Sequence, residues 1–142
     1  MSRDSKRFET IRRLAEKKEH DAAALLARVR RERDQARHRL QELEAFRREY
    51  LEGHGRVSAS GSPARLREFQ AFIDKLEQAI DTQRRLVEES EARHQQARQA
   101  WQERHTRTRA IGNAVEQKRN DERAREARQE QRQLDDRVLR RE

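Results

Sequence analysis

The chain has 142 residues, of which 32% are hydrophobic and 44% are charged, and its formal net charge is +8. So few apolar side chains cannot fill a compact layered core, but they can fill a coiled-coil seam, where only about two positions in seven need to be apolar. The absence of cysteine excludes disulfides and thiolate metal ligands. No apolar run approaches the roughly 18 residues that span a bilayer, and the N-terminus lacks the apolar centre of a signal peptide, so we expect a cytoplasmic protein.

The positive charge is spread along the chain, with acidic residues interleaved throughout. Such a mixed surface is a poor track for phosphates, so the pattern does not favour nucleic-acid binding. A basic coiled coil that binds nucleic acid stays open as an alternative, and it predicts steeply salt-dependent binding to duplex DNA.

The first predicted helix spans about residues 5–52. A heptad counted from Phe8 places apolar or amphipathic side chains at every a position, whereas the d positions are mixed and include Lys18, Glu32 and Arg39. We expect this helix to contribute a thin seam that is unstable without a partner. Its predicted seam residues are Phe8, Ile11, Leu25, Val29, Leu43 and Tyr50.

Residues 53–62, with the sequence GHGRVSASGS, lose this period and are rich in glycine and serine, which predicts a loop. Ser62 followed by Pro63 favours a new helix start, with serine as the N-cap and proline in the first turn. A loop of this length returns the chain antiparallel. The predicted fold is all-α, a single antiparallel coiled-coil hairpin over residues 1–142.

The second predicted helix begins near residue 63 and carries the clearest pattern, in the stretch LREFQAFIDKLEQAI. Apolar side chains follow one another at spacings of three and four residues. Phe72 falls beside this stripe, so a helical partner cannot cover it fully and it invites a second partner. The predicted seam residues of this helix include Leu66, Phe69, Ile73, Leu76, Ile80, Val87 and Trp101.

If Tyr50 faces Leu66, equal lengths of helix place Phe8 opposite about Thr108, so the paired part of the second helix should end near Ile111. The pattern positions beyond that point are polar. Residues 112–142 are therefore predicted to form a polar extension, either a frayed tail or a helix that becomes ordered in a partner.

Nothing in the sequence points to catalysis. The five histidines include no pair four residues apart and no zinc-protease spacing, and the glycines do not form a phosphate-binding loop. A two-helix hairpin also has no water-excluding pocket in which a carboxylate pKa would shift. We expect a non-enzymatic protein without a cofactor, metal or small-molecule substrate, which acts by binding other proteins.

Several stretches, in order, resemble the FliJ family of flagellar protein export. They are RFETIRRLAEKKEHDAAALLA, FRREYL, the glycine- and serine-rich loop, LREFQAFIDKLEQAIDTQRRLVE, the single Trp101 and EQRQLDD. The chain departs from the family in Phe46, where tyrosine is common, in Asp136, where glutamate is more frequent, and in its arginine-rich surface.

The resemblance implies a stalk similar to the γ subunit of rotary ATPases. The end bearing both termini would insert into a hexameric ring of the export ATPase FliI, and the half with the turn would face the cytoplasmic domain of the export gate FlhA at the inner membrane. Family members also handle empty export chaperones. Phe72 and Leu76 match the family's gate-binding residues. As a hypothesis, the ring contacts are Arg119, Arg123, Arg125, Arg128 and Arg132.

Two further alternatives stay open. The corresponding stalk of a virulence injectisome would have a similar shape and role, and the co-purifying ATPase would distinguish the two systems. A generic structural coiled coil would instead form dimers through the first-helix seam and would have no defined partner.

Overall fold

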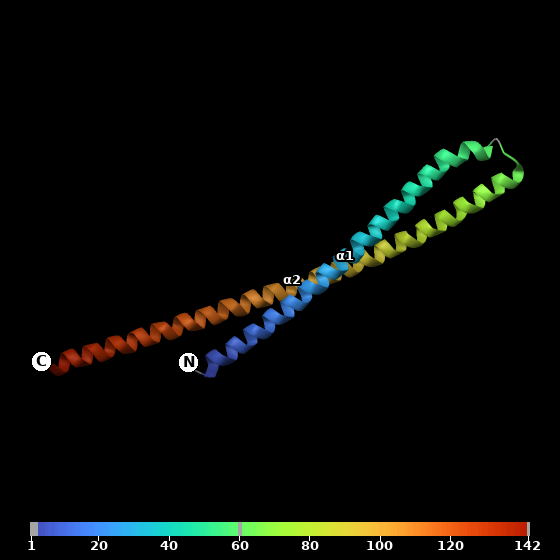
Figure 1. Cartoon of the computed structure of the whole chain (residues 1–142). Helices are drawn as coiled ribbons and strands as arrows, with labels where there is room; N and C mark the ends of the chain where they lie inside the picture. Colours follow the sequence, from blue (N-terminus) through green and yellow to red (C-terminus); the bar gives the residue numbers. More distant parts are fainter. Residues whose placement is uncertain (1–2, 60, 142) are drawn as a thin grey trace. The chain divides into compact units, whose positions relative to one another are not determined.

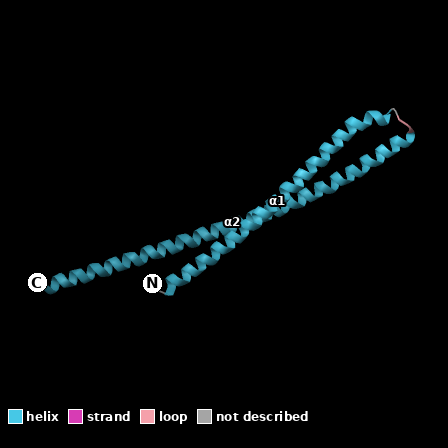
Figure 2. Ribbon diagram, in the orientation of Figure 1, coloured by secondary structure: helices cyan, strands magenta, loops and turns pink. Residues whose placement is uncertain are grey.

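The computed structural model describes the backbone of residues 3–59 and 61–141 and the side chains of residues 3–53 and 61–141. Two helices make up this part of the chain, α1 (Arg3–Ala59, 57 residues) and α2 (Pro63–Arg141, 79 residues) (Figure 1). No strand occurs among the described residues (Figure 2). The predicted all-α fold of two long, antiparallel, mutually packed helices is confirmed.

The contacts divide the chain into two units, and both helices contribute to each of them. The terminal unit contains Met1–Ala23 and Ala100–Glu142, and the turn unit contains Ala24–Gln99. The turn unit therefore holds the connection between α1 and α2, whereas the terminal unit holds both chain ends.

The first helix is longer than its composition suggests, because α1 continues through Gly53 to Ala59. The predicted loop over residues 53–59 is therefore wrong, and the connection is short; its first residue, Ser60, lies outside the described residues. Starting a helix is costly, but adding a residue to an existing one gains a hydrogen bond for each residue that is fixed. That gain offsets the cost of about 1 kcal/mol that glycine carries relative to alanine.

The start of α2 is capped as the sequence predicts. The Ser62 Oγ accepts a hydrogen bond from the Arg65 backbone N–H at 3.4 Å, and the Ser62 carbonyl accepts one from the Leu66 N–H at 3.2 Å. Pro63 occupies the first helical position, where it has no N–H to leave unsatisfied.

In the turn unit, α2 buries the stripe that the sequence marks out, at Ile73, Leu76, Ile80, Val87, Ser90 and Ala97. Leu66 differs from the prediction, since it is 53% exposed. The ring of Tyr50 lies against Phe69 and Phe72, with centroids 5.4 Å and 4.4 Å away, so the aromatic end of the seam lies one to two turns further along α2 than expected. Leu66 is consequently left outside the seam.

The second seam row of α1 lies one residue later than predicted. Its members are half-buried and include more polar than apolar side chains: Arg12, Glu19, Leu26, Arg33, Leu40 and Arg47. The predicted seam residues Ile11 and Leu25 are instead 49% and 41% exposed. Polar groups in a seam need partners. Glu19, Arg33 and Arg47 have them, because they contact His105, His94 and Glu77 of α2.

The pairing of the two helices is displaced by about one heptad from the predicted alignment. Thr108 lies opposite Ala15, whose carbonyl accepts its hydroxyl proton at 3.2 Å. Phe8 lies instead under Lys118, whose Nζ is 4.4 Å from the ring centroid. This displacement follows from the longer α1, because moving the turn along the chain shifts every opposing pair. The paired part of α2 therefore continues past Ile111 to Glu122, which accepts a hydrogen bond from the Ser5 hydroxyl at 2.8 Å.

The helical state of Gly53 can be tested by substitution. A Cβ built at Gly53 or at Gly112 meets no atom within 4 Å. If Gly53 is helical, Gly53→Ala should raise the free energy of unfolding by about 0.5–1 kcal/mol, as Gly112→Ala in the interior of α2 should also do. Urea unfolding followed by circular dichroism measures both changes. A rise for Gly112→Ala without one for Gly53→Ala would place Gly53 in a loop.

Candidate partner-binding surfaces

Four aromatic side chains meet in the turn unit and form what we call the aromatic surface: Phe46 and Tyr50 of α1 with Phe69 and Phe72 of α2. The ring of Tyr50 lies 4.4 Å from that of Phe72, and Phe46 meets Phe72 edge-on at 6.2 Å between centroids. Spacings of four residues on α1 and three on α2 place each pair on one helix face. From the sequence, only Phe72 is predicted to remain partly uncovered. The meeting of the four rings depends on the alignment of the two helices, which the sequence pattern does not fix.

The aromatic surface is only partly covered by its own chain. Phe72 is 37% exposed and Phe46 47% exposed, while Tyr50 and Phe69 are half-buried. Contiguous exposed aromatic area of this kind commonly marks a protein-binding site, because each ring still has apolar surface to remove from water. The prediction that α1 does not fully cover Phe72 agrees with this exposure.

Leu76 does not join Phe72 at the surface. Its side chain is only 7% exposed and lies on the buried stripe between Ile73 and Ile80. The resemblance to the family implied that Leu76 contacts the gate, but this burial gives it a place in the seam, where it supports the helix that carries Phe72. A partner that approaches the aromatic surface meets Phe72 and Phe46.

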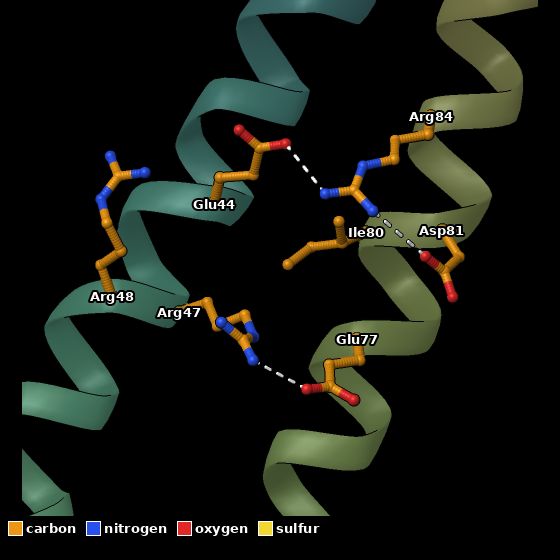
Figure 3. Close-up of a pocket in the computed structure, with 7 residues that line it drawn as sticks. All are labelled: Glu44, Arg47, Arg48, Glu77, Ile80, Asp81 and Arg84. Atoms are coloured by element: carbon orange, nitrogen blue, oxygen red, sulfur yellow. Dashed lines mark hydrogen bonds and ion pairs between the residues drawn. The ribbon is translucent and has the colours of Figure 1, made fainter.

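A polar cleft between α1 and α2 lies elsewhere in the turn unit, with Ile80 among its lining residues (Figure 3). Arg47 pairs with Glu77 across the helices at 2.8 Å, and Arg84 reaches Glu44 at 3.5 Å. These charges pair with one another, and exposed pairs of this type each contribute little free energy. Because these charged side chains are paired across the two helices, the cleft offers no unpaired charge among Arg47, Glu77, Arg84 and Glu44 for a ligand.

His94 lies beside arginine side chains in the seam of the turn unit. The Arg33 Nη1 lies 3.2 Å from the His94 Nδ1. Because a guanidinium has only donors, Nδ1 must accept, which leaves the ring proton on Nε2. Desolvation lowers the pKa of His94, and the positive charges of Arg33, Arg30 and Arg98 lower it further.

This lowered pKa predicts a pH dependence of stability. The unfolded chain, with histidine near its ordinary value of 6.5, binds a proton more readily than the folded one. The contribution of His94 is therefore complete above that pH and is lost as the pH falls below it. His94→Gln should flatten the slope of unfolding free energy against pH in this acid window, as measured by urea titration. His20→Gln, on an exposed position of α1, is the matched control, and an equal change in both variants would contradict the assignment.

The terminal unit contains a second polar cluster in its seam. The Glu19 Oε1 lies 2.5 Å from the His105 Nδ1, and the His105 ring stacks on Trp101 with centroids 4.9 Å apart. The hydrogen bond from His105 lowers the pKa of Glu19. Trp101 is half-buried here and helps to position the imidazole. The cluster joins α1 to α2 within the terminal unit.

The extension of α2 is the second candidate surface. Beyond Glu122 every described residue of α2 is exposed. Of the predicted ring contacts, Arg119 belongs to the paired part instead, since it bonds to Glu9 of α1. Arg125, Arg128 and Arg132 follow at spacings of three and four residues, so they share one helix face, whereas Arg123 lies off that face.

Two kinds of feature are absent from the part of the chain that the structure describes. Among the described residues, no three or more histidine, cysteine or carboxylate side chains gather in a way that could hold a metal ion. Within the same residues, neither helix contains a stretch apolar enough to cross a membrane.

A family model described as "Flagellar FliJ protein" matches residues 5–141, which is nearly the whole chain. No curated protein and no solved structure matches the chain.

Proposed function

From the premise that the chain belongs to the FliJ family and is a component of the flagellar protein-export apparatus, we propose that it links the export ATPase to the export gate. The aromatic surface of the turn unit would bind the gate, and the extension of α2 would bind the ATPase ring. The observation that carries the proposal is that, among the described residues, the turn unit leaves Phe72 and Phe46 partly exposed and the terminal unit leaves α2 exposed beyond Glu122.

The gate partner is the cytoplasmic domain of an FlhA-like protein. Phe72 and Phe46 present aromatic area beside a rigid, packed seam, and rigid aromatic side chains lose little conformational entropy on binding. The buried stripe beneath them holds their backbone in place. A docking site of this kind gains affinity from a few rings rather than from a large area.

The ATPase partner is a FliI-like hexameric ring. An exposed helix with arginines on one face can contact several similar subunits by charge without fitting tightly against one of them. Most of its contact energy would be electrostatic, so it should weaken at high salt. Arg125, Arg128 and Arg132 would carry this contact, with a smaller share for Arg123.

The location and the other partners follow from this role. The chain would be cytoplasmic and would reach the inner membrane only through the gate. Export chaperones released from their cargo are further partners in this proposal, and their binding would place the chain between the ATPase and the gate during substrate delivery.

The aromatic surface can be tested with a purified cytoplasmic gate domain. Phe72→Ala should weaken binding by about tenfold or more, because a central aromatic contact typically costs above 1 kcal/mol when truncated. Leu86→Ala is the matched control, since Leu86 is also an exposed apolar residue of α2, at 44%, outside the aromatic surface. Calorimetry measures affinity, and circular dichroism verifies helicity. Unchanged affinity in folded Phe72→Ala would refute the gate assignment.

A further inference from the structure

The C-terminal part of α2, from Asn113 through the extension, carries a stripe of uncharged side chains. Residues at alternating spacings of four and three are all uncharged, in a segment otherwise dominated by arginine and carboxylates. All of them are exposed, and the two large hydrophobic members, Leu134 and Val138, are 54% and 58% exposed. The uncharged stripe consists of Asn113, Gln117, Asn120, Ala124, Ala127, Gln131, Leu134 and Val138.

The uncharged stripe faces away from α1. Its first members, Asn113 and Gln117, each follow a seam position of α2, Ile111 and Val115, by two residues. Two residues correspond to a rotation of about 200° around a helix, so the stripe lies almost opposite the seam. Because α1 covers the seam face, a second helix can approach the stripe without meeting α1.

The charges beside the stripe alternate in sign every seven residues. One flanking row contains Glu116, Arg123, Glu130 and Arg137, and the other contains Asp121, Arg128 and Asp135. Flanking rows of this kind choose the partner and its direction in coiled coils. A regular alternation therefore selects one alignment and disfavours those shifted by a heptad.

We propose that the occupant of the uncharged stripe is a second copy of the chain, bound antiparallel with Ala124 of each copy against Ala127 of the other. In this alignment Arg123 faces Glu130 of the second copy, and Asp121 faces Arg128. The small alanine side chains allow the two helices to approach closely at the centre.

The parallel alternative brings like charges together. It would place Glu116 beside Asp121 of the second copy, Arg123 beside Arg128, and Glu130 beside Asp135. Asparagine and glutamine occupy half of the stripe, so the antiparallel dimer has little apolar area and is weak and sensitive to salt. The dimer would cover the same helix that the proposed function assigns to the ATPase ring. It is inferred from the uncharged stripe and its flanking charges, so it does not depend on that assignment.

Cysteine pairs test the alignment directly, because the chain contains no cysteine of its own. The proposed dimer places Gln117 of one copy against Leu134 of the other. Full-length Gln117→Cys and Leu134→Cys proteins are mixed, oxidised gently and analysed by mass spectrometry. The mixed disulfide should form well above the share expected from random collision. Gln117→Cys with Ala127→Cys, a pair shifted by a heptad, is the matched control and should stay at the random level.

Charge reversal tests the cause of the alignment. Adding Arg123→Glu to both proteins places two glutamates together and should lower the mixed-disulfide yield about tenfold at low salt. Adding Glu130→Arg as well restores opposite charges and should restore the yield. A random distribution of products, a preference for Gln117→Cys with itself, or a yield unaffected by Arg123→Glu would overturn the proposal and leave the stripe to another protein, such as the ring.

Discussion

Leu76→Ala is expected to lower the free energy of unfolding by about 2–5 kcal/mol, the range for truncating a buried leucine. Leu76 is 7% exposed and lies on the central stripe of α2 in the turn unit. The seam is only one or two side chains wide, so few neighbours can move to fill the cavity. Chemical unfolding followed by circular dichroism measures this change.

Leu66→Ala is the matched control, with the same atoms removed from the same helix. Leu66 is 53% exposed, so its truncation should change the unfolding free energy by no more than about 0.5 kcal/mol. The alignment predicted from the sequence alone, with Leu66 facing Tyr50, requires the two substitutions to cost similar amounts. Equal losses would therefore contradict the structure.

Removing residues 124–142 should abolish stimulation of the export ATPase while gate binding persists. The contacts described between α1 and α2 reach Glu122, through Ser5, so the truncated chain keeps its paired part. It loses Arg125, Arg128 and Arg132, on which the proposed ring contact depends. ATP hydrolysis by the purified ATPase, with and without the chain, measures the effect.

The truncation removes both the arginine charges and the helix that carries them, and a full-length variant separates these two effects. Replacing Arg125, Arg128 and Arg132 by glutamine keeps the helix, because glutamine has a similar helix propensity. This variant should lose most of the stimulation. If it stimulates the ATPase fully while the truncated chain does not, the ring recognises the helix rather than its arginines.

The sequence predicted the buried face of α2 well because one row of this helix carries most of its large aliphatic side chains. Ile73, Leu76 and Ile80 recur at spacings of three and four, and Val87 continues the row. A single clear stripe fixes the buried face of a helix. The burial of these residues and the exposure of Phe72 beside them could therefore be anticipated without a structure.

The second row of α1 could not be placed in the same way. Apolar residues occur on both candidate rows, with Ile11 and Leu25 on one and Leu26 and Leu40 on the other. The choice depends on whether Glu19 finds a partner across the seam, and the spacing of residues along one helix does not contain that information. His105 of α2 is that partner. The row of α1 that contains Glu19, Leu26 and Leu40 therefore lies in the seam.

The wrongly predicted loop over residues 53–59 also changes the predicted alignment of α1 with α2 and, with it, the candidate site. Glycine and serine over residues 53–59 predict a loop, but helix propagation extends α1 through them. The shift in the turn moves Tyr50 from Leu66 to Phe69 and Phe72, and this brings Phe46 into the aromatic surface. A four-ring site therefore could not be foreseen from the residues that build it.

The central claim is that one chain binds two partners through two separate surfaces. Analytical ultracentrifugation of the chain with both the ATPase and the gate domain tests it most directly. The wild-type chain should form a ternary complex, Phe72→Ala should lose the gate domain alone, and the chain without residues 124–142 should lose the ATPase alone. Competition between the ATPase and the gate domain for the wild-type chain, or loss of both partners from either variant, would contradict the account.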